Sequence, residues 1–144
     1  MQEFIDFLGR NPVLSVAWAG LFIALIVTTI KAATSKVKSI RYQEAVQLIN
    51  KQSAKVVDIR GRDDYKKGHI VDAIHVAMAD IKNKRLGALE KMKQDPIILV
   101  CNAGMTSSQA AQLLSQQGFE TVYSLHGGMS DWTANNMPVA RKKR

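Results

Sequence analysis

The chain has 144 residues, a formal net charge of +8 and a single cysteine, and 47% of its residues are hydrophobic. That length suits one globular domain with some chain to spare. A single cysteine excludes an intramolecular disulfide. The three histidines are scattered, without the spacing of metal ligands, so we predict neither a metal site nor a cofactor.

Positive charge is concentrated in residues 31–144, which hold 19 basic and 10 acidic residues and carry a net charge of +9. Such a balance suits an anionic partner, which can be acidic lipid, a small anion or nucleic acid. Binders of single-stranded nucleic acid interleave aromatic side chains with a basic stripe, and the chain shows no such stripe. Nucleic acid is therefore not an expected partner.

The first strong pattern along the chain is an uncharged run of twenty residues, 11–30, between Arg10 and Lys31. As a helix this run measures about 30 Å, the thickness of the hydrocarbon core of a bilayer. Asn11 suits an N-cap and Pro12 the first helical position. We predict a transmembrane helix over 11–30, with a buried core helix and a cleaved signal peptide as the alternatives. A core helix usually carries a polar stripe and a signal peptide a basic start, and both are missing here.

Basic residues on either side of this run predict its orientation. Arg10 alone precedes it, whereas four basic residues follow it closely, namely Lys31, Lys36, Lys38 and Arg41. By the positive-inside rule, residues 1–10 form a short non-cytoplasmic N-terminus and the remainder lies in the cytoplasm. The bilayer is thus an expected partner. Gly20 and Ala24 form a small-xxx-small pair, which would let a helix of another inner-membrane protein approach closely.

The rest of the chain alternates between short apolar runs and helical patterns. Residues 31–39 are polar and are assigned to a linker, and the basic tail, 139–144, either rests on an anionic leaflet or is a solvated terminus. In chain order we predict helix 42–50, strand 55–59, a helical turn 63–67, loop 68–70, strand 75–78, helix 80–93 with Asp80 as N-cap, strand 96–101, helix 108–117 stopped by Gly118, strand 121–125 and helix 130–135. This alternation is typical of an α/β fold with a mostly parallel sheet.

Cys101 follows the apolar run 97–100 and precedes a small polar turn, 102–107, that leads into a helix. Ligands of parallel sheets bind beyond the carboxyl ends of the strands, where this thiol lies. Backbone N–H groups of the turn and the helix dipole lower the pKa of a thiol so placed, and its thiolate is a nucleophile. The alternative is a buried, inert cysteine. The candidate nucleophile is Cys101, and the candidate anion-binding loop is Asn102, Ala103, Gly104, Met105, Thr106 and Ser107.

Three stretches together resemble the rhodanese-like domain family, in the single-domain, membrane-anchored form of bacterial inner membranes. They are 56–60 with 64–70, the loop 101–107, and 118–132. The resemblance covers about residues 38–138, of which 40–138 are assigned to the domain, and it implies a three-layer fold around a central, mostly parallel sheet. It also implies support by Asp58, Arg60 and His69, a tight turn at Gly127 and Gly128, and a core position for Trp132.

The resemblance further implies sulfur transfer. The cysteine of active rhodaneses takes sulfane sulfur from a donor such as thiosulfate or a persulfide, holds it as a persulfide and passes it to a thiol acceptor. Such members commonly have arginine at the last position of the loop, where this chain has Thr106. Loss of that charged contact weakens anion binding by about 1.5–3 kcal/mol, roughly 10- to 150-fold.

Two hypotheses follow from this departure. One is a membrane-tethered sulfurtransferase or sulfane-sulfur carrier with Cys101 as its nucleophile. The other is a weak or inactive rhodanese-like module that binds a partner protein at the inner membrane. A phosphatase of the related Cdc25 type is rejected, because its loop is one residue longer and phosphoryl transfer needs the arginine that this chain lacks.

Overall fold

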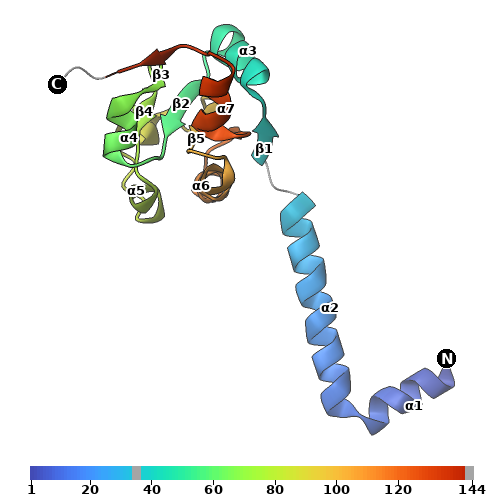
Figure 1. Ribbon diagram of the computed structural model, residues 1–144. Coiled ribbons are helices and arrows are strands. Elements are labelled where there is room, and N and C mark those ends of the chain that lie inside the picture. The colour runs from blue at the N-terminus through green and yellow to red at the C-terminus, as the bar shows by residue number, and fades with distance from the viewer. Residues whose placement is uncertain (34–36, 142–144) are drawn as a thin grey trace. The chain divides into compact units, whose positions relative to one another are not determined.

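The computed structural model describes residues 1–33 and 37–141, and its contacts divide the chain into two units, Met1–Ser35 and Lys36–Arg144. Each unit is described by itself. The first is helical, and the second contains every strand of the described chain (Figure 1).

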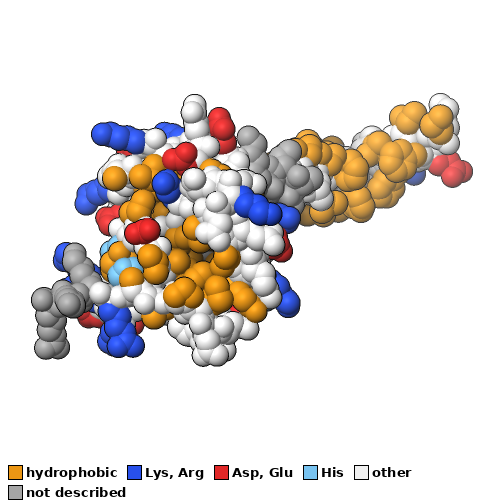
Figure 2. Space-filling view, turned by 90° about the horizontal axis from the view of Figure 1, so that it is seen from above, with side chains coloured by type: hydrophobic (Ala, Val, Ile, Leu, Met, Phe, Trp, Pro, Cys, Tyr) orange, Lys and Arg blue, Asp and Glu red, His pale blue; other side chains and the backbone are white. Residues whose placement is uncertain are grey.

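The N-terminal unit consists of two helices, α1 (Gln2–Arg10) and α2 (Pro12–Ala33). From Pro12 to Ile30 helix α2 is long and apolar enough to cross a membrane, and none of that stretch is buried; a signal sequence would pass the same test. Figure 2 shows apolar side chains covering this unit. The helix predicted over 11–30 is present and runs on to Ala33. Helix α1 was not predicted from the sequence.

The second unit is built on a parallel sheet in the order β1-β6-β5-β2-β4. Its strands are β1 (Val37–Ile40), β2 (Lys55–Asp58), β4 (Ile74–His75), β5 (Ile97–Val100) and β6 (Val122–Leu125). Two further strands, β3 (His69–Ile70) and β7 (Val139–Ala140), form a separate antiparallel pair. Strand β5 lies in the middle and is apolar and buried on both faces, as parallel strands usually are. The predicted α/β class and parallel sheet are confirmed.

Helices cover both faces of the sheet, so the fold has three layers (Figure 1). Ile97 and Leu99 of β5 pack on one face with α6 (Met105–Gln116), α5 (Met78–Lys82) and the 3-10 helix η1 (Gly87–Met92). Ile98 and Val100 point to the other face, toward α3 (Tyr42–Gln52) and α7 (Gly128–Ala134). The short helix α4 (Arg62–Lys67) adds Tyr65 to this second core.

Several predicted boundaries are wrong. Residues 37–39 of the predicted linker belong to β1, which pairs in register with β6, while residues 34–36 lie outside the described residues. The predicted loop 68–70 contains β3, and the strand predicted over 75–78 is β4, shifted toward the N-terminus. The helix predicted over 108–117 begins three residues earlier, at Met105.

The helix predicted over 80–93 is two separate pieces, α5 and η1. Lys84 lies between the two pieces with a φ of 57°, and Gly87 begins η1 with a φ of 56°. Both values lie in the left-handed region. A right-handed helix cannot continue through that conformation. The N-cap of α5 is Ala77 rather than Asp80.

Candidate active site

Cys101 is the first residue after β5, at the carboxyl edge of the sheet, and only 5% of it is exposed. The backbone N–H of Gly104 donates a hydrogen bond of 2.9 Å to its Sγ atom. The chain then enters α6 at Met105. The sulfur thus lies inside a turn of backbone between the central strand and the start of a helix.

The start of α7 fixes the back of this loop. The N–H of Met129 donates to the Cys101 carbonyl at 2.8 Å, and the N–H of Ser130 donates to the Asn102 carbonyl at 3.1 Å. Gly128 has a φ of 55°, and a Cβ atom there would collide with the Cys101 carbonyl. Because these carbonyls point toward α7, the N–H groups of the loop are free to face the sulfur.

Gly104 is the second glycine that the loop requires. Its φ is +95°, and a Cβ atom would come within 3.0 Å of the backbone nitrogen of Gly127 and 3.2 Å of the Leu125 carbonyl oxygen. Glycine adopts this conformation without steric cost. The loop therefore packs closely on the turn between β6 and α7, and Gly104 can point its N–H at the thiol.

Burial raises the pKa of the Cys101 thiol, but hydrogen bonds outweigh burial and lower the pKa below its ordinary value. The hydroxyl of Ser107 contributes most, followed by the backbone N–H groups of Ser107, Gly104 and Ala103. Each of these donors favours the thiolate over the thiol. The anionic form of the Cys101 sulfur is thus stabilised by neutral dipoles.

A group of buried hydroxyls lies behind the thiol. The Ser107 and Ser124 oxygens are 2.8 Å apart, the Ser108 and Ser124 oxygens 3.2 Å, and Ser107 is also 2.9 Å from the Gly104 carbonyl oxygen. Ser107 and Ser124 are almost completely buried. The Ser107 hydroxyl donates to the Gly104 carbonyl in this arrangement. Turned toward the sulfur instead, it would stabilise the thiolate, and Ser124 can donate to Ser107 in turn. Sequence analysis missed Ser124, whose only signal is a polar residue in a buried strand.

The rim of the loop is exposed and uncharged. Asn102, Ala103, Met105 and Thr106 are all exposed, Met105 to 82%, and residues 101–107 include no charged side chain. The predicted loop residues thus divide into two groups. Gly104 donates its N–H to the sulfur, and Ser107 and Ala103 also help to lower the pKa of the thiol. Asn102, Met105 and Thr106 contribute only to the exposed rim.

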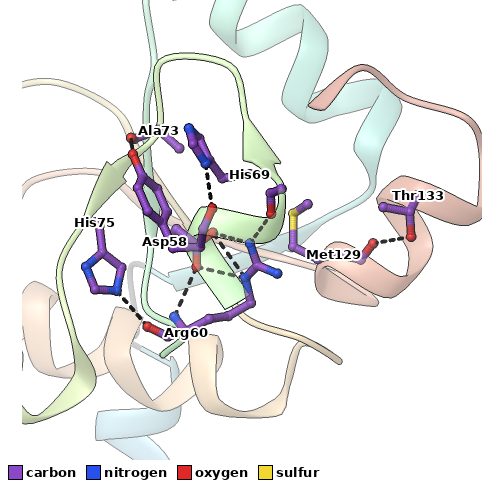
Figure 3. A network of polar contacts seen from close by, with 9 residues as sticks. Asp58, Arg60, His69, Ala73, His75, Met129 and Thr133 are labelled. Carbon is purple, nitrogen blue, oxygen red and sulfur yellow. Dashed lines mark hydrogen bonds and ion pairs between the residues drawn. The ribbon is translucent and has the colours of Figure 1, made fainter. Parts of the chain in front are cut away.

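Asp58, at the end of the neighbouring strand β2, forms a buried ion pair with Arg60, two residues further on (Figure 3). Arg60 Nη2 lies 2.7 Å from Asp58 Oδ2 and 2.6 Å from the Gly68 carbonyl oxygen, and its Nε contacts both carboxylate oxygens at 3.0–3.1 Å. The two side chains are 8% and 1% exposed. Because Asp58 and Gly68 occupy its guanidinium, Arg60 cannot serve as the cation that the loop lacks.

The two histidines near this pair form hydrogen bonds with backbone carbonyl groups. His69 Nδ1 lies 2.7 Å from the Tyr65 carbonyl oxygen, and its ring stacks on that of Tyr65 with centroids 3.9 Å apart. His75 Nε2 lies 2.7 Å from the Arg60 carbonyl oxygen, a contact that sequence analysis missed (Figure 3). Burial, with a smaller contribution from Asp58, raises the pKa of Tyr65, whose hydroxyl donates to the Ala73 carbonyl. In the described part of the chain, no three acidic, histidine or cysteine side chains gather as metal ligands.

Comparisons with known proteins point to one family. The family profile described as "Rhodanese-like domain" matches residues 42–135. Escherichia coli YibN is 46% identical over 143 residues, which cover 99% of this chain and all of that protein. Thiosulfate sulfurtransferase GlpE of Coxiella burnetii is 37% identical over 100 residues, covering 69% of this chain and 90% of GlpE.

Solved structures agree with the family match. The rhodanese-like domain of Alr3790 from Anabaena superimposes with a TM-score of 0.63 at 26% identity. The superposition covers 72% of this chain and 79% of that domain. The three-layer fold is thus shared with proteins of the same description.

Proposed function

We propose that this chain, which belongs to the rhodanese-like domain family, is a sulfurtransferase that carries sulfane sulfur as a persulfide on Cys101. One observation carries the proposal. The only thiol of the chain lies among hydrogen-bond donors from Ser107, Gly104 and Ala103 that lower its pKa. Oriented dipoles of this kind stabilise an anion where it forms, as the terminal sulfur of a persulfide requires.

The chemistry consists of two displacements. The Cys101 thiolate attacks the terminal sulfur of a donor R–S–S⁻, a new S–S bond forms, and R–S⁻ leaves with the electron pair of the old bond. An acceptor thiolate then attacks the terminal sulfur of the Cys101 persulfide, and the Cys101 thiolate is regenerated. With thiosulfate as donor the leaving group is sulfite. No external oxidant or reductant is needed.

The uncharged rim favours a persulfide donor over thiosulfate. Thiosulfate is a small dianion whose binding benefits from a cation, and neither Thr106 nor the paired Arg60 supplies one. A low-molecular-weight or protein persulfide carries less charge and offers an organic group that can contact the exposed Met105. We therefore propose a persulfide as the donor and a thiol as the acceptor.

We further propose that α2 tethers the domain to the bacterial inner membrane, with residues 1–10 outside and the domain in the cytoplasm. The support is the uncharged apolar stretch Pro12–Ile30 and the excess of basic residues after it. Full-length protein from membranes should keep its N-terminus and resist alkaline carbonate extraction. A chain cleaved after the apolar stretch would instead identify a signal sequence.

Intact-mass measurement tests the sulfur chemistry. Full-length protein in detergent is incubated with a persulfide donor or with thiosulfate, beside Cys101→Ser as the matched control. The expected result is a gain of one sulfur atom that the variant lacks and that a thiol acceptor removes. Loading of the variant, or no loading with any donor, would contradict the proposal.

The second candidate is a rhodanese-like module that binds another inner-membrane protein without transferring sulfur. Thr106 in place of arginine favours it, together with Met105, an apolar side chain exposed beside the thiol. Under this hypothesis, Cys101→Ser retains a co-purifying membrane partner and deletion of residues 1–33 loses it. Sulfurtransferase function predicts instead that the thiol is needed for transfer whether or not a partner is bound.

A further inference from the structure

The short helix α1 is amphipathic, although it precedes the apolar helix. Its four large apolar side chains, Phe4, Ile5, Phe7 and Leu8, are 40–69% exposed and fall on one side of a helical projection. Its charged residues, Glu3, Asp6 and Arg10, fall on the opposite side. No residue of α1 is buried. An exposed apolar face of this kind needs a partner other than water.

The bend between α1 and α2 is specified by Pro12 and Ser15 (Figure 1). Proline has no N–H, so the Leu8 carbonyl lacks the partner that a continuous helix would supply. The Ser15 hydroxyl lies 3.2 Å from that carbonyl oxygen and 2.9 Å from the carbonyl oxygen of Asn11. Because the Ser15 hydroxyl binds the carbonyl that proline leaves without a partner, the bend has a defined geometry.

The apolar face of α1 continues into the apolar surface of α2 across this bend. Both helices line one apolar hollow, formed by Phe4, Phe7, Leu8, Leu14, Ser15 and Trp18. The apolar stretch of α2 is itself unburied. A single apolar environment can therefore cover both helices.

We propose that α1 is an interfacial helix, which lies in the headgroup region of the bilayer with its apolar face toward the acyl chains. This inference rests on the membrane tether proposed above. Free interfacial helices usually need several basic residues to reach a membrane, whereas α1 has Arg10 and two acidic residues. Covalent linkage to the span holds α1 at the surface at a high effective concentration, so it needs no such attraction. We therefore expect α1 to bind uncharged phosphatidylcholine bilayers.

An accessibility measurement with spin labels tests this placement. The full-length chain with Cys101→Ser has no thiol, so Phe4→Cys, Asp6→Cys or Ile23→Cys each gives one labelling site. Each labelled protein is reconstituted in phosphatidylcholine vesicles. The collision rates of the nitroxide with oxygen, which concentrates in the bilayer, and with a water-soluble nickel chelate are then compared.

Ile23 reports the tether, and the pair Phe4 and Asp6 reports α1. High oxygen and low nickel access at Ile23 establishes the span, and high nickel access there contradicts the tether itself. With the span established, we expect Phe4 to favour oxygen and Asp6, two residues away, to favour nickel. Equal nickel access at both positions would place α1 in water. Protection of Phe4 from both reagents would show that protein covers this face; either result overturns the proposal.

Discussion

Two buried polar groups lie side by side at the carboxyl edge of the sheet, and they differ in how their charge is satisfied. Asp58 ends β2 and pairs in register with Val100, the residue before Cys101. At Asp58 a full negative charge meets the full positive charge of Arg60, and the guanidinium also binds the Gly68 carbonyl. At Cys101 the thiolate has hydrogen-bond donors, and no cation among residues 1–33 and 37–141 contributes to its pKa.

This difference separates structural from chemical roles. A buried ion pair directs its two charges at each other rather than at a substrate, and removing one partner leaves the other charge buried and unpaired. A sulfur held by neutral dipoles keeps its lone pairs and its negative charge available for attack. The pair therefore supports the edge of the sheet, and the loop beside it suits the sulfur transfer proposed above.

The largest effect should come from breaking the ion pair. Arg60→Ala leaves the Asp58 carboxylate buried and unpaired, so we expect the free energy of unfolding to fall by about 3–5 kcal/mol. Trp132, 3% exposed, reports unfolding in urea when Trp18→Phe removes the other tryptophan. The exposed neighbour Arg62 gives the matched control, Arg62→Ala. A loss below 1 kcal/mol, equal to that of the control, would contradict a structural role for the pair.

Adding a cation to the loop should give the second-largest effect, because it supplies at Cys101 the positive charge that Asp58 already has in Arg60. Thr106→Arg places a guanidinium on the exposed rim, where it can bind thiosulfate. We expect kcat/KM for thiosulfate to rise about 10- to 150-fold, the equivalent of about 1.5–3 kcal/mol. Thr106→Gln, longer than threonine but neutral, is the control and should leave the constant near its original value. An equal rise in both variants would show that charge is not what the rim lacks.

Removing one neutral donor should have a smaller effect. Ser107→Ala deletes the hydroxyl that most lowers the pKa of Cys101, so that pKa should rise and less thiolate should be present at neutral pH. The rate of alkylation by iodoacetamide should fall severalfold at pH 7, consistent with a hydrogen bond of about 0.5–1.5 kcal/mol. Its dependence on pH should shift to higher values.

Ser108→Ala is the matched control for this measurement. The Ser108 hydroxyl contacts Ser124 and the Gly104 carbonyl at 3.2–3.3 Å and is not among the groups that lower the pKa of Cys101. Its removal should leave the alkylation profile nearly unchanged. A profile that shifts equally in both variants would mean that the whole hydroxyl group, rather than Ser107, sets the pKa of the thiol.

The features that could be predicted from the sequence are those that leave a local signal in it. Periodicity and turn residues are local signals, so the parallel sheet, the position of Cys101 and the apolar helix were all predictable. The contact of Ser124 joins β6 to helix α6, and the contact of His75 joins β4 to Arg60, which lies just after β2. Each joins residues 15 or more positions apart in the chain, and no local pattern records such a contact. The prediction of one helix over 80–93 was wrong because the apolar pattern does not show the backbone conformation of two residues within it. Lys84 and Gly87 adopt left-handed backbone inside an apolar pattern that suits a helix.

Among these predictions, the smallest effect is a dependence of stability on pH. The pKa of Cys101 is lower in the folded protein than in the unfolded chain, so the unfolded chain binds more protons between those two pKa values. The free energy of unfolding should therefore rise with pH across that window and lose this contribution as pH falls through the folded pKa. Cys101→Ser should remove this part of the slope, measured by urea unfolding of both proteins across the window. Ser107→Ala should make the slope shallower by narrowing the window, and a slope unchanged in Cys101→Ser would assign it to other groups.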